Sequence, residues 1–343
     1  MFLDNTPGRT CFINQKEYLF FSGYSYLGMN HVGEFTRTIK EGIDRYGILF
    51  PSSRNSNTRL QLFEKAEDSL SILTSRPESV LFSSGYLAGQ TISDILSRYA
   101  NIYIAPGTHP AICVPGRHVS TGSFSEWTQN ILEEINRHKD HAVIIADSIN
   151  IMEGMVNDFS FVKQIAPGIR IIFLVDDSHG IGILGDNGEG IISRLPHHDN
   201  IDYFISYSLS KAFGIPGGGI SASAEICNLL RAHPNYTGST SMSPAHVHAF
   251  TESRGLYLKQ KKKLEQNILR FASAIHRPGP LSPLPVFVCD KEDAGELFFR
   301  KGVVISSFSY PYPGSQLVNR FIMNALHTDS DIDKLATILE EIN

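Results

Sequence analysis

Cysteines are few in this sequence, and none stand close together. The four of them, Cys11, Cys113, Cys227 and Cys289, are separated by long intervals. A zinc site or a disulfide framework requires cysteines at short or regular spacings. We therefore expect four reduced thiols and no metal site.

Long apolar runs are also missing. The chain has no stretch of about 18 consecutive apolar residues, the length that a membrane-spanning helix requires. Its first residues lack the basic segment followed by a continuous apolar one that marks a secretory signal. We expect a soluble, cytoplasmic protein without a membrane partner.

The chain has no block of basic residues. Its 30 lysines and arginines are outnumbered by 35 aspartates and glutamates, and the formal net charge is −5. Because binding to a nucleic-acid backbone depends on clustered positive charge, we do not expect nucleic acid as a partner.

The middle of the chain carries a regular pattern of short β-branched runs separated by amphipathic segments. The runs occupy residues 79–82, 101–105, 142–147, 171–177, 203–208 and 218–223. Strands that are buried on both faces and alternate with helices form mostly parallel sheets. The pattern predicts an α/β fold, with a mostly parallel sheet covered by helices.

The pattern changes after about residue 234. A long helical stretch, 243–276, leads through the proline-rich "RPGPLSPLP" into a strand, a helix, two strands and a last helix. Thr328, Asp329 and Ser330 are capping candidates for that last helix. The pattern predicts a smaller C-terminal α+β domain.

We therefore divide the chain into three parts. Residues 1–39 are an N-terminal arm, residues 40–233 a large α/β domain, and residues 234–343 the small domain. A chain of 343 residues can bury one large core and one smaller core.

A glycine motif follows the fourth predicted strand. Gly180, Gly182 and Gly185 match the G-x-G-x-x-G pattern of dinucleotide-binding turns. Such a turn opens a helix at its third glycine. Here the sequence continues as "DNGEGIISRLPHHDN", with a turn and then Pro196, so dinucleotide binding is disfavoured.

Two charged residues stand at the ends of consecutive predicted strands. Asp176 ends one strand, and Lys211 follows the next in a loop rich in serine and glycine. Open α/β sheets bind ligands at these strand ends. A strand-end turn and a surface lysine are the alternatives for each residue alone. Together they suit pyridoxal phosphate (PLP), because a lysine can bind it covalently and a carboxylate can keep its pyridine nitrogen protonated.

A phosphate site is predicted where the first strand meets a helix. Ser84, Gly85 and Tyr86 stand at the start of that helix, and Ser208 lies three residues before Lys211. Backbone N–H groups at a helix N-terminus and nearby hydroxyls favour anions. An ordinary helix cap is the alternative for the serine alone.

The order of several motifs resembles that of a known family. The motifs are "YLGM", "FSSGYLAG", "GTHPAI", "VDDSHGIGILGDNGEG", "SLSKAFGIPGGG", "STSMSP" and "NRFIMNALHTDSDID", from about Tyr26 to the C-terminus. The chain resembles the α-oxoamine synthases, which are PLP enzymes of fold type I. Within them it is most similar to the 8-amino-7-oxononanoate synthases, through "STSM", and to the glycine C-acetyltransferases.

The resemblance implies a role for each matching residue. Lys211 would hold PLP covalently and remove the substrate's α-proton, and Asp176 would pair with the pyridine nitrogen. His179 would hydrogen-bond the phenolic oxygen of PLP or the substrate carbonyl. His109, which could otherwise be an ordinary turn residue, would stack on the pyridine ring.

The remaining site residues also come from the resemblance. The phosphate would be held by Ser84, Gly85, Tyr86 and Ser208, while Ser239 and Thr240 would reach the phosphate of a second subunit in a homodimer. Arg320 would bind the substrate carboxylate, for which a paired hydrogen bond from arginine is well suited. Ser25 would lie near the substrate.

The chain also departs from the family. Family members have a longer N-terminal arm, an asparagine in place of Ser25 and often a serine in place of Ile151, and the region around Arg54 is shortened here. These departures leave the predicted PLP site untouched, and they alter part of the surroundings of the substrate and of the acyl-CoA, the expected acyl donor.

The sequence thus predicts a PLP-dependent acyltransferase, similar to 8-amino-7-oxononanoate synthase, that condenses an amino acid with an acyl-CoA and releases CO2. A PLP-dependent aminotransferase or aldolase is an alternative, because PLP serves several reactions. A binding protein that retains the fold without turnover is a second alternative.

Overall fold

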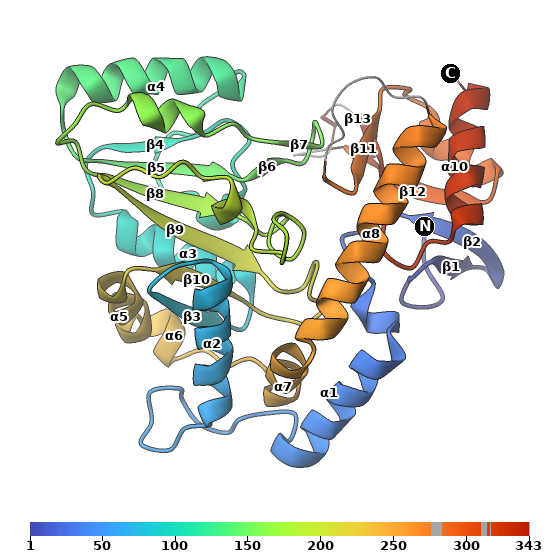
Figure 1. Cartoon of the computed structure of the whole chain (residues 1–343), viewed down its shortest axis with the longest axis horizontal. Coiled ribbons are helices and arrows are strands. Elements are labelled where there is room, and N and C mark those ends of the chain that lie inside the picture. Colours follow the sequence, from blue (N-terminus) through green and yellow to red (C-terminus); the bar gives the residue numbers. More distant parts are fainter. Residues whose placement is uncertain (276–282, 310–313, 316, 343) are drawn as a thin grey trace.

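Two β-sheets organise the protein (Figure 1). The computed structural model describes residues 1–275, 283–309, 314, 315 and 317–342. One sheet has six strands in the order β3-β10-β9-β8-β5-β4, and the other has five in the order β1-β2-β12-β13-β11. A hairpin of β6 (Ile149–Asn150) and β7 (Met155–Val156) reaches from the first sheet toward β11 and β13.

The six-stranded sheet is formed by the runs that the sequence pattern identified. Its strands are β3 (Glu78–Phe82), β4 (Ile102–Ile104), β5 (Ala142–Asp147), β8 (Ile171–Asp176), β9 (Ile201–Ser208) and β10 (Gly218–Ala222). Strands β4, β5, β8 and β9 are parallel neighbours, and β10 runs antiparallel to both β9 and β3. The predicted α/β fold with a mostly parallel sheet is confirmed.

Helices cover both faces of this sheet. Side chains of one face pack on α3 (Gly85–Leu96) and α5 (Ala224–Ala232), and those of the other face pack toward α2 (Gln61–Leu73) and α4 (Phe124–His138). Because side chains alternate along a strand, Phe173 and Leu174 of β8 belong to different apolar clusters. This double burial explains why the strands read as continuous apolar runs.

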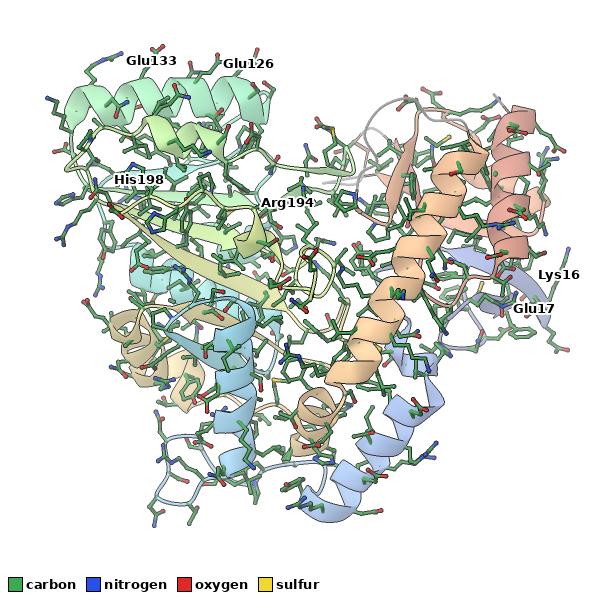
Figure 2. All side chains as sticks on the ribbon, viewed as in Figure 1. Lys16, Glu17, Glu126, Glu133, Arg194 and His198 are labelled. Carbon is green, nitrogen blue, oxygen red and sulfur yellow. The ribbon has the colours of Figure 1, made fainter. Side chains whose placement is uncertain are left out.

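Helix α4 shows the matching pattern on the helical side. Trp127, Ile131 and Ile135 are buried against the sheet, whereas Glu126 and Glu133 point away from it in Figure 2. Ser123 begins the helix by accepting the Glu126 N–H, and the Glu126 carboxylate accepts the Ser123 N–H in return. The periodicity of the sequence therefore determines which face of α4 meets the sheet.

The second sheet combines the two ends of the chain. Its strands are β1 (Thr10–Ile13), β2 (Lys16–Phe21), β11 (Val286–Cys289), β12 (Val303–Ser309) and β13 (Leu317–Ile322). Strand β2 pairs in parallel with β12. The C-terminal order of strand, helix, two strands and helix is as predicted, with α9 (Ala294–Arg300) and α10 (Asp329–Ile342) as the helices.

The predicted long helix over 243–276 is wrong in one respect. The structure has two helices there, α7 (Pro244–Glu252) and α8 (Arg254–Ala274), which differ in direction in Figure 1. The break is at Ser253, whose φ of −106° and ψ of 16° lie outside the helical range. The last predicted residue, His276, lies outside the described residues.

The start of α10 agrees with the capping prediction. The Thr328 hydroxyl accepts the Asp331 N–H at 3.4 Å, and the Asp331 carboxylate accepts the Thr328 N–H at 2.8 Å. Asp331 also pairs with Arg9 at 2.8 Å, which attaches the N-terminal segment to this helix.

The division into an arm, a large domain and a small domain stays a proposal. Strands β1 and β2 of the predicted arm complete the C-terminal sheet. Helix α1 (Gly33–Tyr46) continues across the predicted boundary at residue 39 and packs on α7. A four-residue helix, α6 (Pro234–Thr237), lies just after the second boundary.

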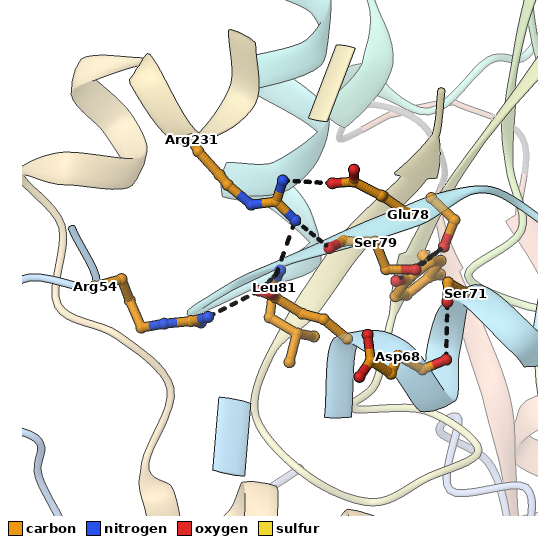
Figure 3. A network of polar contacts seen from close by, with 10 residues as sticks. Arg54, Asp68, Ser71, Glu78, Ser79, Leu81 and Arg231 are labelled. Carbon is orange, nitrogen blue, oxygen red and sulfur yellow. Dashed lines mark hydrogen bonds and ion pairs between the residues drawn. The ribbon is translucent and has the colours of Figure 1, made fainter. Parts of the chain in front are cut away.

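A buried ion pair covers the edge strand β3 (Figure 3). Glu67 of α2 accepts the backbone N–H of Leu81 at 2.9 Å and pairs with Arg54 at 3.0 Å. The Arg54 guanidinium lies over the Phe63 ring, 4.1 Å from its centroid. Burial raises the pKa of Glu67 although Arg54 acts in the opposite direction. The pair thus gives a partner to a strand N–H that faces no neighbouring strand.

A buried histidine joins β2 to the loop before α10. The His327 ring stacks on Phe21 with centroids 3.8 Å apart. Its Nε2 donates to the Phe20 carbonyl at 3.0 Å, and its Nδ1 accepts the Asn324 N–H at 3.1 Å. These contacts need the neutral ring, and burial lowers the pKa of His327 to about 4.

Acidification should therefore weaken this connection. An unfolded chain protonates the ring near its ordinary pKa of 6.5. The contribution of His327 to the free energy of unfolding is therefore fully present above that pH and is lost as the pH falls toward 4. The whole effect is about 3 kcal/mol, of which about 2 kcal/mol is lost by pH 5. Urea unfolding at pH 7.5 and pH 5 measures the loss. The free energy of unfolding of the apo chain should fall by about 2 kcal/mol less in His327→Gln than in wild type, because His179 and His109, whose pKa values are also lowered by burial, titrate in both proteins. The exposed His118→Gln is the matched control, and an equal loss in all three proteins would contradict the role.

Candidate functional site

A cavity of about 330 Å³ lies at the carboxyl ends of β5, β8 and β9. Seven predicted site residues line it: Gly85, Tyr86, His109, Asp176, His179, Ser208 and Lys211. A larger and more open hollow of about 820 Å³ lies beside α8 and contains none of the predicted residues. The residues that line a cavity, and not its volume, therefore identify the candidate site.

Neighbouring strands place Asp176 and Lys211 at this cavity. Asp176 ends β8, is buried, and accepts the Ser178 N–H at 2.8 Å through one oxygen. Lys211 follows β9, the strand beside β8. Burial lowers the pKa of Lys211, although the carboxylates of Asp176, Asp147 and Asp177 act in the opposite direction. A lysine with a lowered pKa is more readily a free amine, the form that attacks carbonyl groups and accepts protons.

Two tyrosines from the N-terminal segment surround His179. The Tyr26 hydroxyl is 2.6 Å from His179 Nδ1, and the Tyr24 ring meets the imidazole edge-on with centroids 5.5 Å apart. Nζ of Lys211 lies 5.7 Å from the ring centroid of Tyr24. Burial lowers the pKa of His179 well below its usual range, and the Lys211 and Arg320 charges lower it further. His179 is therefore a neutral ring held in one orientation.

His109 follows β4, at the same edge of the sheet as the carboxyl ends of β5 and β8. Its Nδ1 accepts the Ala111 N–H at 3.1 Å, which fixes the ring relative to the short helical turn that follows. Burial lowers the pKa of His109, and Lys211 adds to this effect while Asp176 opposes it. A neutral imidazole at the cavity wall is suited to stacking on an aromatic ring.

The N-terminus of α3 forms another wall. Ser84 caps the helix by accepting the Leu87 N–H at 3.1 Å. Gly85 packs so closely on Ser208 that an added Cβ would lie 2.9 Å from the serine Cβ. The glycine thus brings the first helical turn, with its N–H groups, next to the Ser208 hydroxyl.

This wall fits a phosphate, and the cavity as a whole fits PLP. Helix N–H groups and a hydroxyl face one end, Asp176 is available for a pyridine nitrogen, and Lys211 is available for covalent attachment. No cluster of three or more histidine, cysteine, aspartate or glutamate side chains that could hold a metal occurs in the described part of the chain. Among the described residues, no helix is both long and apolar enough to cross a membrane.

Five predicted residues do not line this cavity. Ser239 and Thr240 lie in a partly exposed loop after α6, and Ser25 lies between the two tyrosines, with its carbonyl accepting the Gly28 N–H at 3.0 Å. The fourth is Arg320. The fifth is Ser84, also predicted at the phosphate, whose hydroxyl serves as the helix cap.

Arg320 lies in the interior of the second sheet. It is 3% exposed, and its strand β13 pairs with both β11 and β12, so Arg320 does not lie on an exposed edge strand. One terminal nitrogen donates to the Ile151 carbonyl of the β6-β7 hairpin at 3.1 Å. Its Nε is buried and has no hydrogen-bond partner among the described residues. A buried N–H of this kind is a ready donor for a carboxylate.

Gly180, the first glycine of the G-x-G-x-x-G pattern, and Gly190 beyond the pattern pack against a buried carboxyl group. A Cβ on Gly180 or Gly190 would lie about 2 Å from an oxygen of Asp177. Asp177 is fully buried, accepts the Ile191 N–H at 2.7 Å, and has its pKa raised to about 8 by burial. The glycines thus make room for a loop around Asp177, and no helix of the length that a dinucleotide turn requires follows them.

Sequence reasoning missed three residues of the site: Asp147, Tyr24 and Tyr26. Asp147 carried the same signal as Asp176, an aspartate at the end of a buried strand, and lies directly opposite it in the sheet. The two tyrosines had no comparable signal, because only the fold brings the N-terminal segment to this cavity.

Known proteins resemble this chain over most of its length. A family model described as aminotransferase class I and II matches residues 17–339. The 8-amino-7-oxononanoate synthase of Thermosipho melanesiensis is 24% identical over 96% of this chain and 90% of that protein. The enzyme of the same name from Buchnera aphidicola subsp. Baizongia pistaciae is 26% identical over 94% and 88%.

Solved structures show the same fold. Serine palmitoyltransferase from Sphingomonas wittichii superposes with a TM-score of 0.84 at 19% identity, covering 98% of this chain and 90% of the other. The 8-amino-7-oxononanoate synthase of Francisella tularensis gives a TM-score of 0.74 at 22% identity, with 95% and 98% covered. These likenesses confirm the predicted fold type I architecture.

Proposed function

Because the chain belongs to the aminotransferase class I and II family, we propose that it is a PLP-dependent acyltransferase of the α-oxoamine synthase type that condenses an amino acid with an acyl-CoA. One observation carries the proposal. Lys211 and Asp176 lie at the ends of neighbouring strands and line one cavity, whose other wall is a helix N-terminus. The names of the relatives, 8-amino-7-oxononanoate synthases, support the acyltransferase reaction.

The proposed reaction balances without an oxidant or a reductant. A bond forms between Cα of the amino acid and the thioester carbonyl carbon, and the carbon–sulfur bond breaks. The amino acid's carboxylate leaves as CO2, and one proton is taken up as the thiol is released. When bound, PLP supplies an electron sink for the electron pair left at Cα when a bond there breaks.

The protein's own residues would divide the remaining work. Lys211 would hold PLP covalently and then, as a free amine, take the α-proton. Asp176 would keep a positive charge on the facing pyridine nitrogen. His179, oriented by Tyr26, would donate a hydrogen bond from its Nε2 to an oxygen of PLP or the substrate, and His109 would stack on the ring.

A thiol-release assay tests this function directly. Purified protein with PLP should release free CoA only when an amino acid and an acyl-CoA are both present, and labelled carboxylate should appear as CO2. Transfer of the amino group to a 2-oxo acid without thiol release would indicate an aminotransferase, and release of an aldehyde would indicate an aldolase. The absence of turnover with every pair would favour a binding protein.

Arg320→Lys tests whether the substrate is held by its carboxylate. Lysine keeps the positive charge but lacks the planar fork, so amino acids should bind about 10- to 100-fold more weakly. Simple amines without a carboxylate should bind as before. Titrations followed by the visible absorbance of bound PLP measure both. Equal losses for both ligands would mean that Arg320 supports the fold through Ile151, and no loss for either would place it outside the site.

We also propose a cytoplasmic homodimer. Ser239 and Thr240 lie outside the cavity of their own chain. Ser239 is half-buried and Thr240 is exposed, and this placement fits a role toward the phosphate of a second subunit. Sedimentation of the purified protein tests the dimer, and Ser239→Ala combined with Thr240→Ala should weaken PLP binding only if the two chains share the site.

A further inference from the structure

Asp147 is a further residue of the candidate site. It ends β5, lies directly opposite Asp176 of β8 in the sheet register, and lines the cavity. The family resemblance assigned it no role. Its side chain therefore needs an explanation from its contacts.

The side-chain carboxyl group of Asp147 holds the backbone of His109. Its two oxygens both accept the His109 N–H, at 3.2 Å and 3.1 Å. The loop that carries His109 is also held by the Thr108 hydroxyl, which donates to the Ala105 carbonyl at 2.8 Å, and by the bond between the His109 ring and the Ala111 N–H. After His109, the Gln90 amide of α3 donates to the Pro110 and Ala111 carbonyls at 3.0 Å. Asp147 is thus the contact that ties His109 to the neighbouring strand.

The surroundings of Asp147 favour a neutral carboxyl group. Burial raises its pKa well above the usual range, and the charge of Asp176 raises it further, while the His109 N–H and Lys211 act in the opposite direction. A neutral acid can still accept the His109 N–H through its carbonyl oxygen. An asparagine side chain, which has the same shape, reproduces that oxygen.

We propose that Asp147 is a positioning residue, which places the His109 ring over the PLP site by holding the backbone N–H of His109. The proposal rests on the proposed function only in that PLP occupies the cavity. Asp147 acts through His109 and need not touch the substrate.

A double-mutant cycle on PLP affinity tests the proposal. Ring stacking contributes about three- to tenfold to affinity, so His109→Ala and Asp147→Ala should each weaken PLP binding to the apo chain by about that factor. Because both act through one ring, the double variant should bind PLP no more weakly than His109→Ala alone. Asp147→Asn should retain affinity within about twofold, since its carbonyl oxygen keeps the contact.

Other results would overturn the proposal. If the two losses multiply in the double variant, Asp147 acts independently of His109. If Asp147→Asn binds PLP as weakly as Asp147→Ala, the charge and not the hydrogen bond matters. Asp147→Leu, which is close in size and lacks an acceptor, replaces the alanine variant if that one does not fold. Failure of the proposed acyltransferase reaction is separate, because it appears as absent thiol release while the cycle on PLP affinity still holds.

Discussion

Replacing Lys211 by alanine should remove covalently held PLP and reduce turnover by at least about four orders of magnitude. Loss of a general base alone costs about 10²- to 10⁴-fold, and loss of covalent attachment adds to that cost. The purified variant should lose its visible absorbance on dialysis. Borohydride should fix PLP to Lys211 in wild type and leave the variant unlabelled.

The chain offers a matched control for this variant. Lys261 is also a buried lysine, but it pairs with Glu265 on α8, away from the cavity. Lys261→Met should keep both the absorbance and the borohydride label. Retained label in Lys211→Ala would show that another lysine holds PLP, and a wild-type protein that PLP cannot colour would refute the assignment of the cofactor.

Asp176→Asn should leave PLP bound but slow removal of the substrate's α-proton by about 10²- to 10³-fold. A neutral amide cannot keep the pyridine nitrogen protonated, so the negative charge that develops at Cα loses its stabilisation, a loss of this size when one such group is removed from a site. The asparagine oxygen can still accept the Ser178 N–H, so the loop after β8 should keep its shape. Exchange of the α-proton for deuterium, followed by NMR, measures the rate.

Asp177→Asn is the control one residue away. Asp177 is buried and does not line the cavity, and its pKa, raised to about 8, makes it largely neutral at pH 7. An amide of the same shape should therefore be tolerated, with exchange close to that of wild type. Near-normal exchange in Asp176→Asn, or an equal loss in both variants, would contradict the role given to Asp176.

The fold class could be predicted because its signals are local. A strand such as Ile171–Asp176 shows its burial on both faces as a continuous apolar run, and α4 shows its buried stripe in three residues at helical spacing. The predicted strands agree with the observed ones to within two residues at either end. The break at Ser253 was not predicted, because the apolar pattern continues across it and only packing on other helices turns the chain.

The part of the candidate site that lies at the strand ends could be predicted from the sequence. Asp176 and Lys211 were identified by their places after buried strands, and the structure brings them to one cavity. The PLP-dependent family is confirmed by the match over residues 17–339. The roles of the individual residues stay predictions.

The sequence by itself determined the parallel sheet, the order of its strands along the chain and the chemical groups at their ends, because contiguous residues carry those signals. Only the tertiary structure decided which groups meet. Tyr26 reaches His179, Arg320 reaches Ile151 and Asp147 reaches His109 across intervals of the chain that no local pattern spans. The physical reason is that these contacts follow from how the two sheets and the N-terminal segment pack, and periodicity along one segment holds no information about its distant neighbours.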